Sequence, residues 1–207
     1  MIATTVVVAH PDRLDAAKRL TDDLDAELFV DTDRLGAWGN HERALRWAAG
    51  QPASHALIVQ DDAVPVPDFR DHAAQAIAHR PEGLIGFYVG RTRPRAEQVA
   101  RAVHAAEQVH ASWLSADTLL WGVATAVPTA DIPELLRHAR RSTLPYDQRL
   151  GLWYRDRGIP VHYTWPSLVE HADGPSLIPR RRFHRPRVAW RVGAPSRWDG
   201  PTVRIEG

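Results

Sequence analysis

The sequence predicts an α/β fold with a mostly parallel central sheet. Segments with strand and helix periodicity alternate over about the first sixty residues, which is typical of a layered α/β domain. The first of them, over 4–9, is a β-branched run that is apolar on both faces, as expected of a buried parallel strand. The chain has 207 residues, of which 44% are hydrophobic and 25% charged, and these values favour one globular domain.

The elements of the first part of the chain follow from hydrophobic spacing. After residue 13, Leu14, Ala17, Leu20 and Leu24 recur at the interval of an amphipathic helix. The elements expected here are a strand over 4–9, a helix over 13–23, a strand over 26–30, a glycine-containing loop over 36–40, a helix over 41–49 and a strand over 55–59.

The second part is less regular. Asp131 is expected to cap a helix that begins with Ile132 and Pro133. Gly158 is expected to end the helix over 145–157. The elements expected here are a helix over 68–80, a strand over 84–89, a helix over 95–110, an apolar segment over 119–127, helices over 132–141 and 145–157, and a short strand over 161–164.

The pattern ends near residue 179. Residues 180–207 contain eight arginines and two carboxylates. We therefore predict one domain over 1–178 and a basic, arginine-rich, loosely structured C-terminal extension over 179–207.

Composition and missing motifs exclude several classes of protein. The chain has no cysteine, which excludes disulfide scaffolds, thiolate metal sites and cysteine nucleophiles. It has no P-loop, no Gly-x-Gly and no Gly-x-Ser-x-Gly motif, which argues against P-loop nucleotide hydrolysis, dinucleotide binding and serine hydrolysis. No signal peptide or apolar run of membrane-spanning length is found, and we expect a cytoplasmic protein.

Polar residues follow three of the predicted strands. They are His10-Pro11-Asp12-Arg13, Asp31-Thr32-Asp33 and Gln60-Asp61-Asp62. Ligands of open α/β sheets bind beyond the carboxyl ends of the strands, so these residues are expected to converge on one site. Adjacent carboxylates beside a cationic loop suit a phosphorylated ligand with Mg²⁺ or Mn²⁺. Taken alone, two aspartates after a strand are more often a helix cap and a solvated turn.

Five segments together carry a family resemblance. They are Trp38-Gly39-Asn40-His41, the run from His55 through Gln60-Asp61-Asp62 to Phe69, Leu120 to Ala126, Leu144-Pro145-Tyr146-Asp147, and Pro166 to His171. In this order they resemble glycosyltransferases of the GT-A fold, closest to glycosyltransferase family 25 and related phage-type glycosyltransferases. Gln60 stands where the family usually has an acid, and 125–127 lacks its usual tyrosine.

The resemblance implies a GT-A-like α/β/α sandwich that moves a sugar from a nucleotide-diphosphate sugar, expected to be a UDP-sugar, to an acceptor hydroxyl. It implies that Asp62 and His171 hold Mn²⁺ or Mg²⁺ and that Asp147 is the general base. The donor would be contacted by the residues His10, Arg13, Asp31, Asp33, Trp38, Asn40, Gln60 and Asp61.

Each of these assignments has a structural alternative. Asp147 is equally well placed to cap a helix after proline. A histidine such as His171 is by default a core or loop residue, and a tryptophan such as Trp38 is more often core than a stacking platform.

The basic extension predicts a partner. Arginines alternate with aromatic residues there, which is typical of nucleic-acid binding by phosphate contact and base stacking. The residues concerned are Arg180, Arg181, Arg182, Arg185, Arg187 and Trp190. A hydroxylated base in DNA, as in some phage systems that resemble this group, is one expected acceptor, and an envelope or lipopolysaccharide saccharide is the other.

Other functions stay open at this level. The arginines of the extension could instead be solvated or reach the donor phosphates. A nucleotidyltransferase would also use acidic strand ends, and a non-catalytic nucleic-acid-binding module would need only the extension. Oligomeric state, the sugar and the stereochemistry of transfer are not indicated by the sequence.

Overall fold

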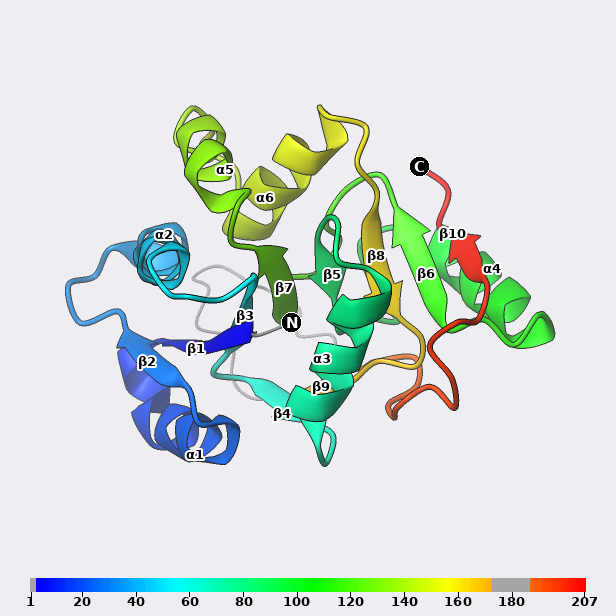
Figure 1. The fold of residues 1–207 in the computed structure, drawn as a ribbon, viewed down its shortest axis with the longest axis horizontal. Helices are drawn as coiled ribbons and strands as arrows, with labels where there is room; N and C mark the ends of the chain where they lie inside the picture. The colour runs from blue at the N-terminus through cyan, green and yellow to red at the C-terminus, as the bar shows by residue number, and fades with distance from the viewer. Residues whose placement is uncertain (1–2, 173–186) are drawn as a thin grey trace.

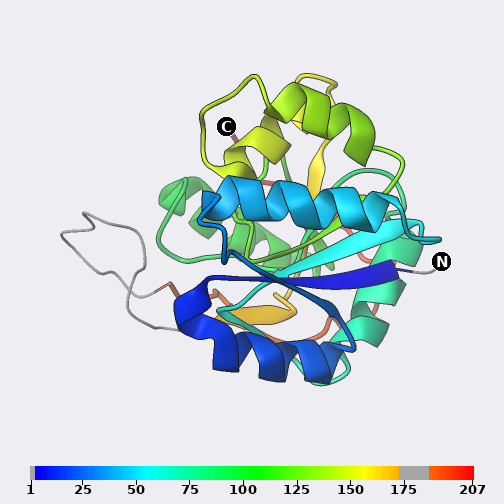
Figure 2. The same cartoon turned by 90° about the vertical axis from the view of Figure 1, so that its left-hand side faces the viewer.

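A sheet of eight strands runs through the centre of the molecule, with helices on both faces (Figures 1 and 2). The computed structural model describes residues 3–172 and 187–207. Its strands are β1 Ala3–Ala9, β2 Glu27–Val30, β3 His55–Gln60, β4 Ala63–Pro65, β5 Ile85–Gly86, β6 Trp113–Ala116, β7 Ala124–Pro128, β8 Val161–Thr164, β9 Val169–His171 and β10 Thr202–Arg204. Its α-helices are α1 Leu14–Leu24, α2 Gly36–Ala49, α3 Phe69–His79, α4 Ala96–Gln108, α5 Ile132–Ala139 and α6 Tyr146–Arg155, and a 3₁₀ turn spans Pro11–Arg13.

The strand order in the sheet is β10-β6-β8-β5-β7-β3-β1-β2. Strands β2, β1 and β3 are parallel, as are the pairs β5–β8 and β10–β6, whereas β7 is antiparallel to β3 and β5, and β6 is antiparallel to β8. The described sheet is thus mostly parallel. The predicted GT-A-like α/β/α sandwich fits this architecture.

The connections between the first three strands run in opposite directions across the sheet: β1 to β2 one way, and β2 to β3 back past β1. Strand β2 lies on one side of β1 and β3 on the other. Because crossover connections between parallel strands are right-handed, α1 and α2 must then cover opposite faces. Figure 2 shows α1 below the sheet and α2 above it. The carboxyl ends of β1 and β3 therefore flank a topological switch point, where open α/β sheets form a crevice.

Helix α2 begins earlier than the sequence predicts. The expected loop over 36–40 is helical, because both oxygens of Asp31 accept backbone hydrogen bonds at the start of the helix. They accept from the amides of Leu35 and Gly36 at 2.7 and 2.8 Å. A side chain that satisfies the free amides of the first turn stabilises a helix end.

Two small pairings were not predicted. Strand β4 pairs with β9 in a separate two-stranded antiparallel sheet, in which Ala63 lies opposite His171. The amide of Ala172 also donates to the carbonyl oxygen of Asp62 at 2.7 Å. These contacts bring His171 beside the turn that follows β3.

The described part of the C-terminal segment, 187–207, is packed on the domain, which corrects the expectation of a loose extension for these residues. Strand β10 pairs with β6, and the indole nitrogen of Trp113 donates to the carbonyl oxygen of Trp198 at 2.9 Å. Trp198 and Ile205 are buried. Apolar burial of this kind stabilises an ordered segment. The boundary near residue 178 stays a prediction.

The helices of the described residues are short or polar. Across 3–172 and 187–207 no helix combines the length and apolar character that crossing a bilayer requires.

A buried histidine predicts acid sensitivity. His41 in α2 stacks on Tyr146 with ring centroids 3.7 Å apart, and burial lowers its pKa from 6.5 to about 4. The unfolded chain therefore binds a proton between pH 6.5 and 4 that the folded state does not, so stability falls as the pH is lowered through this window. We expect His41 to contribute up to roughly 3 kcal/mol to this loss.

Denaturant unfolding between about pH 7 and pH 4 measures the effect. His41→Phe should flatten the pH dependence of the unfolding free energy, and His104→Phe, at an exposed position of α4, should leave it unchanged. Equal pH dependence in wild type and His41→Phe would contradict the prediction.

Candidate functional site

The residues that follow β1 and β3 meet at the switch point. His10 follows β1, and Asp61 and Asp62 follow β3. The amide of Asp61 donates to the carbonyl oxygen of Val8 at 3.1 Å, which ties the acidic turn to the neighbouring strand. The amide of His10 donates to Oδ2 of Asp61 at 2.7 Å. The two predicted strand ends thus meet directly.

Arg13 links the two aspartates. Its Nη1 lies 2.9 Å from Oδ1 of Asp61 and 2.6 Å from Oδ2 of Asp62. Burial opposes the charge of Arg13, but the hydrogen bonds and charges of both carboxylates outweigh it, and its pKa is raised. One guanidinium therefore offsets much of the repulsion between neighbouring carboxylates.

The pKa values of the two carboxylates shift in opposite directions. Burial raises the pKa of Asp61 above its ordinary value, and the His10 amide and Arg13 offset this only in part. Burial also acts to raise the pKa of Asp62, but hydrogen bonds and charge from His171 and Arg13 outweigh it and lower the pKa. Asp62 is accordingly the more acidic of the pair, and its charged form is the one the site stabilises.

His171 contacts the same oxygen of Asp62 as Arg13 does. Its Nε2 lies 3.2 Å from Oδ2 of Asp62 and is also 2.9 Å from Nη1 of Arg187. Arg187 is thus part of the candidate site, a placement that the sequence does not predict, because the pattern around it indicates nucleic-acid binding. The only sequence signal for Arg187 is its position in an arginine-rich segment. Such a pattern does not indicate which way a side chain points.

The two predicted metal ligands, Asp62 and His171, each have one polar atom without a hydrogen-bond partner in the described residues. Oδ1 of Asp62 and Nδ1 of His171 are buried and have no hydrogen-bond partner in the described residues. In those same residues, no three His, Asp or Glu side chains cluster as a ready-made metal cage. Mg²⁺ usually takes one or two carboxylates and completes its shell with substrate phosphates and water. The free oxygen of Asp62 fits that arrangement.

Tyr146 connects the acidic turn to Asp147. The Tyr146 hydroxyl accepts a hydrogen bond from Nε2 of Gln60 at 2.7 Å and donates one to the carbonyl oxygen of Gly122 at 2.5 Å. Gln60 is the residue just before Asp61, so the start of α6 is tied to the end of β3. Sequence reasoning quoted Tyr146 in a motif but gave it no role.

Asp147 lies in the first turn of α6. Its Oδ1 accepts from the amide of the next residue, Gln148, at 2.8 Å, and Pro145 occupies the cap position of the helix. Burial raises the pKa of Asp147. A carboxylate with a raised pKa is a stronger base than an exposed one, which suits proton abstraction.

The other predicted donor residues have partners within the fold. Asp31 caps α2, as described above, and Asp33 pairs with Arg43 at 3.2 Å. Asn40 donates to the carbonyl oxygen of Phe29 at 2.8 Å, which holds α2 against the end of β2. Arg149 of α6 stacks on Trp38, with its guanidinium carbon 4.6 Å from the ring centroid.

Two surface cavities share no lining residue with this site. One, of about 130 Å³, is lined by residues of α5 and by Arg141 and Arg157. The other, of about 510 Å³, lies between α1 and residues 65–71. The charged side chains that follow the strands converge at the switch point and not at either cavity.

Comparisons with known proteins find similar solved structures but no matching family or sequence. No protein-family model matches the chain, and no curated protein sequence matches it. Among solved structures, the chain is similar to A197 from STIV, with a TM-score of 0.47 and 12% identity over 83% of this chain and 86% of that chain.

Two further solved structures are similar to a comparable extent. One is a glycosyltransferase involved in glycosylation of the major capsid of PBCV-1, with a TM-score of 0.43 and 11% identity over 84% of this chain and 94% of that chain. The other is mannose-1-phosphate geranyltransferase from Thermus thermophilus, with a TM-score of 0.39 and 15% identity over 79% of this chain and 74% of that chain. At TM-scores this low these likenesses do not bear on function, which we infer from the site residues.

Proposed function

We propose that this protein is a glycosyltransferase that moves a sugar from a nucleotide-diphosphate sugar to an acceptor hydroxyl. The observation that carries the proposal is the convergence of Arg13, Asp61, Asp62, His171 and Arg187 at the switch point between β1 and β3. Buried carboxylates flanked by two arginines suit a ligand that brings its own negative charge and a cation.

The residues of the site must stabilise the leaving group of the reaction, which is the nucleoside diphosphate. Cleavage of the bond between sugar and diphosphate leaves negative charge on the diphosphate. Arg13 contacts Asp62 and Arg187 contacts His171, and guanidinium groups bind phosphate oxygens with paired hydrogen bonds. Charges held ready at the place where charge develops lower the barrier of such a step.

Asp62 is the residue that would hold Mn²⁺ or Mg²⁺, through the buried oxygen that has no partner in the described residues. A divalent ion bound there would act as a Lewis acid on the diphosphate of the donor. His171 positions Asp62 through the other carboxylate oxygen. Asp61, held by the His10 amide and Arg13, fixes the turn from which Asp62 projects.

Asp147 is the proposed general base. A sugar acceptor needs its hydroxyl proton removed as the new bond forms, and a half-buried carboxylate such as Asp147 supplies this function. The Tyr146–Gln60 hydrogen bond supports the assignment, because it joins the turn that carries Asp147 to the acidic turn.

Release of nucleoside diphosphate from a panel of nucleotide sugars, UDP-sugars among them, tests the proposal. We expect release that depends on Mn²⁺ or Mg²⁺ and that falls at least roughly 100-fold in Asp62→Asn. Asp22→Asn, on the exposed face of α1, is the matched control and should keep full activity.

Two outcomes would contradict this function. Release of pyrophosphate instead of nucleoside diphosphate would identify a nucleotidyltransferase. Unchanged donor binding and turnover in Asp62→Asn, with the melting temperature recorded for each variant, would remove the metal assignment.

The acceptor is a separate proposal. Of the residues assigned to DNA, Arg180, Arg181, Arg182 and Arg185 lie outside the described residues. Arg187 contacts His171, and the guanidinium of Arg91 lies 5.5 Å from the Trp190 ring centroid. A DNA base and a saccharide therefore both remain proposed acceptors, and product analysis with each distinguishes them.

A further inference from the structure

The helix layer formed by α2, α5 and α6 is basic. Residues 36–49 and 132–157 carry eight arginines and four carboxylates. Helices α1 and α3 lie on the opposite face of the sheet (Figure 2), and residues 14–25 and 68–79 carry three basic residues and six carboxylates. The two faces thus differ in sign although the formal net charge is only +1. Such an asymmetry orients an approaching polyanion.

Two of the four carboxylates of this layer, Glu42 and Glu134, are each shared between two arginines, and Asp156 lies 3.6 Å from His138 and 3.8 Å from Arg155. Oε1 of Glu42 lies 2.7 Å from Arg46 and 2.8 Å from Arg140. Glu134 lies 3.4 Å from Arg137 and 3.2 Å from Arg157. A single carboxylate balances one guanidinium charge, so each of these sets leaves positive charge on the surface.

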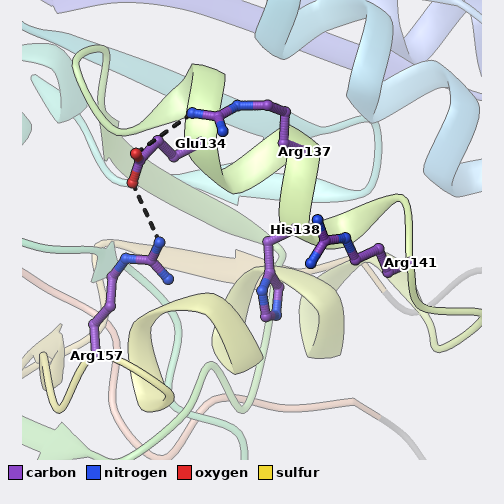
Figure 3. A pocket seen from close by; sticks show the side chains of 5 residues that line it. All are labelled: Glu134, Arg137, His138, Arg141 and Arg157. Carbon is purple, nitrogen blue, oxygen red and sulfur yellow. Dashed lines mark hydrogen bonds and ion pairs between the residues drawn. The ribbon is translucent and has the colours of Figure 1, made fainter.

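A hollow of about 130 Å³ lies within this layer. It is lined by Glu134, Arg137, His138, Arg141 and Arg157 (Figure 3), and we call it the α5–α6 groove. Figure 3 shows His138 between Arg141 and Arg157, with Glu134 joined to both Arg137 and Arg157. No ion pair joins Arg141 to a carboxylate in the part of the chain that the structure describes.

We propose that the α5–α6 groove binds the phosphate groups of a nucleic-acid backbone. Guanidinium groups match phosphate oxygens with paired hydrogen bonds, and arginines in and just after neighbouring helices match the repeated charges of a polyanion. Arg140, just after α5, and Arg46 in α2 share Glu42 and extend the charged surface onto α2. The α5–α6 groove shares no lining residue with the candidate site at β1 and β3, and its binding does not require a sugar donor.

The surface chemistry favours nucleic acid over a lipid bilayer. Faces that bind membranes combine basic residues with exposed apolar side chains that enter the lipid. The exposed large hydrophobic residues of the described chain are Leu35, Val64, Val109, Leu144, Val188 and Val192. Of these, Leu144 lies in the connection between α5 and α6 and Leu35 directly precedes α2. Two separate leucines do not make the continuous apolar face that enters lipid.

Fluorescence anisotropy with a labelled oligonucleotide, single- and double-stranded, over a salt series tests the proposal on the full chain. The test variant combines Arg137→Gln, Arg141→Gln and Arg157→Gln. The control combines Arg19→Gln, Arg70→Gln and Arg101→Gln, exposed arginines of α1, α3 and α4, and changes the net charge equally. Arg141→Gln alone removes a side chain with no carboxylate partner in the described residues, so the variant should be as stable as wild type.

We expect the groove variant to bind roughly 10- to 100-fold more weakly at low salt and to reduce the slope of log affinity against log salt by about three. Arg141→Gln should reduce the slope by about one, and the control should bind like wild type. Equal weakening in groove variant and control, no oligonucleotide binding by wild type, or binding only to anionic vesicles would overturn the proposal. Loss of nucleoside-diphosphate release would bear on the transferase function alone.

Discussion

Replacing Asp147 by asparagine is expected to slow sugar transfer by roughly 10²–10⁴-fold, the contribution of a general base. The variant keeps the size of the side chain and an oxygen that accepts the Gln148 amide, so α6 should still form. It loses the ability to take a proton from the acceptor. The effect should fall on kcat with acceptor present, and donor binding should be unchanged.

A pH profile separates this role from a structural one. A base is active when deprotonated, so transfer should fall as the pH is lowered through the pKa of Asp147. Burial raises that pKa, so the fall should begin at a higher pH than for an ordinary aspartate. Asp71→Asn, on the exposed surface of α3, is the control and should keep the wild-type profile. Full transfer activity in Asp147→Asn would rule out this assignment.

Replacing Gly122 by alanine is expected to disturb the fold and the site together. A Cβ at this position would overlap the hydroxyl and ring of Tyr146. Tyr146 must then move, which breaks its hydrogen bonds to Gln60 and to the Gly122 carbonyl oxygen. Overpacking of this kind typically costs about 1–3 kcal/mol.

Denaturant unfolding and turnover together measure this effect. Gly50→Ala is the control, because the nearest neighbour of its added Cβ, the Trp47 carbonyl oxygen, stands at an ordinary 3.4 Å. Tyr146→Phe retains the ring that stacks on His41 but lacks the hydroxyl, so it isolates the link to Gln60. We expect turnover to drop in both Gly122→Ala and Tyr146→Phe. A Gly122→Ala protein as stable and as active as wild type would show that Tyr146 moves without consequence.

The N-terminal unit could be predicted because its signals are local. Hydrophobic spacing marks β1, α1, β2 and β3, and the rule of right-handed crossovers determines the faces that their helices cover. The start of α2 was misplaced, because the hydrogen bonds from the amides of Leu35 and Gly36 to Asp31 leave no mark in hydrophobic spacing.

The later strands illustrate what spacing does not report. Strand β5 is confined to Ile85–Gly86 although 84–89 is apolar throughout, and β6 at Trp113–Ala116 was not predicted. Buried apolar residues are needed wherever the core is filled, whether or not the backbone there pairs with a neighbouring strand. Pairing depends on which segments the rest of the fold brings alongside.

The sequence by itself determined the α/β class, the parallel β2-β1-β3 unit and the polar residues at its strand ends, because these depend on residues close together in the chain. The tertiary structure decided which distant groups join them. Pairing of β4 with β9 brings His171 to Asp62, the packing of 187–207 brings in Arg187, and Tyr146 ties α6 to Gln60. Contacts between residues so far apart in the chain depend on how the core packs as a whole, which no local pattern encodes.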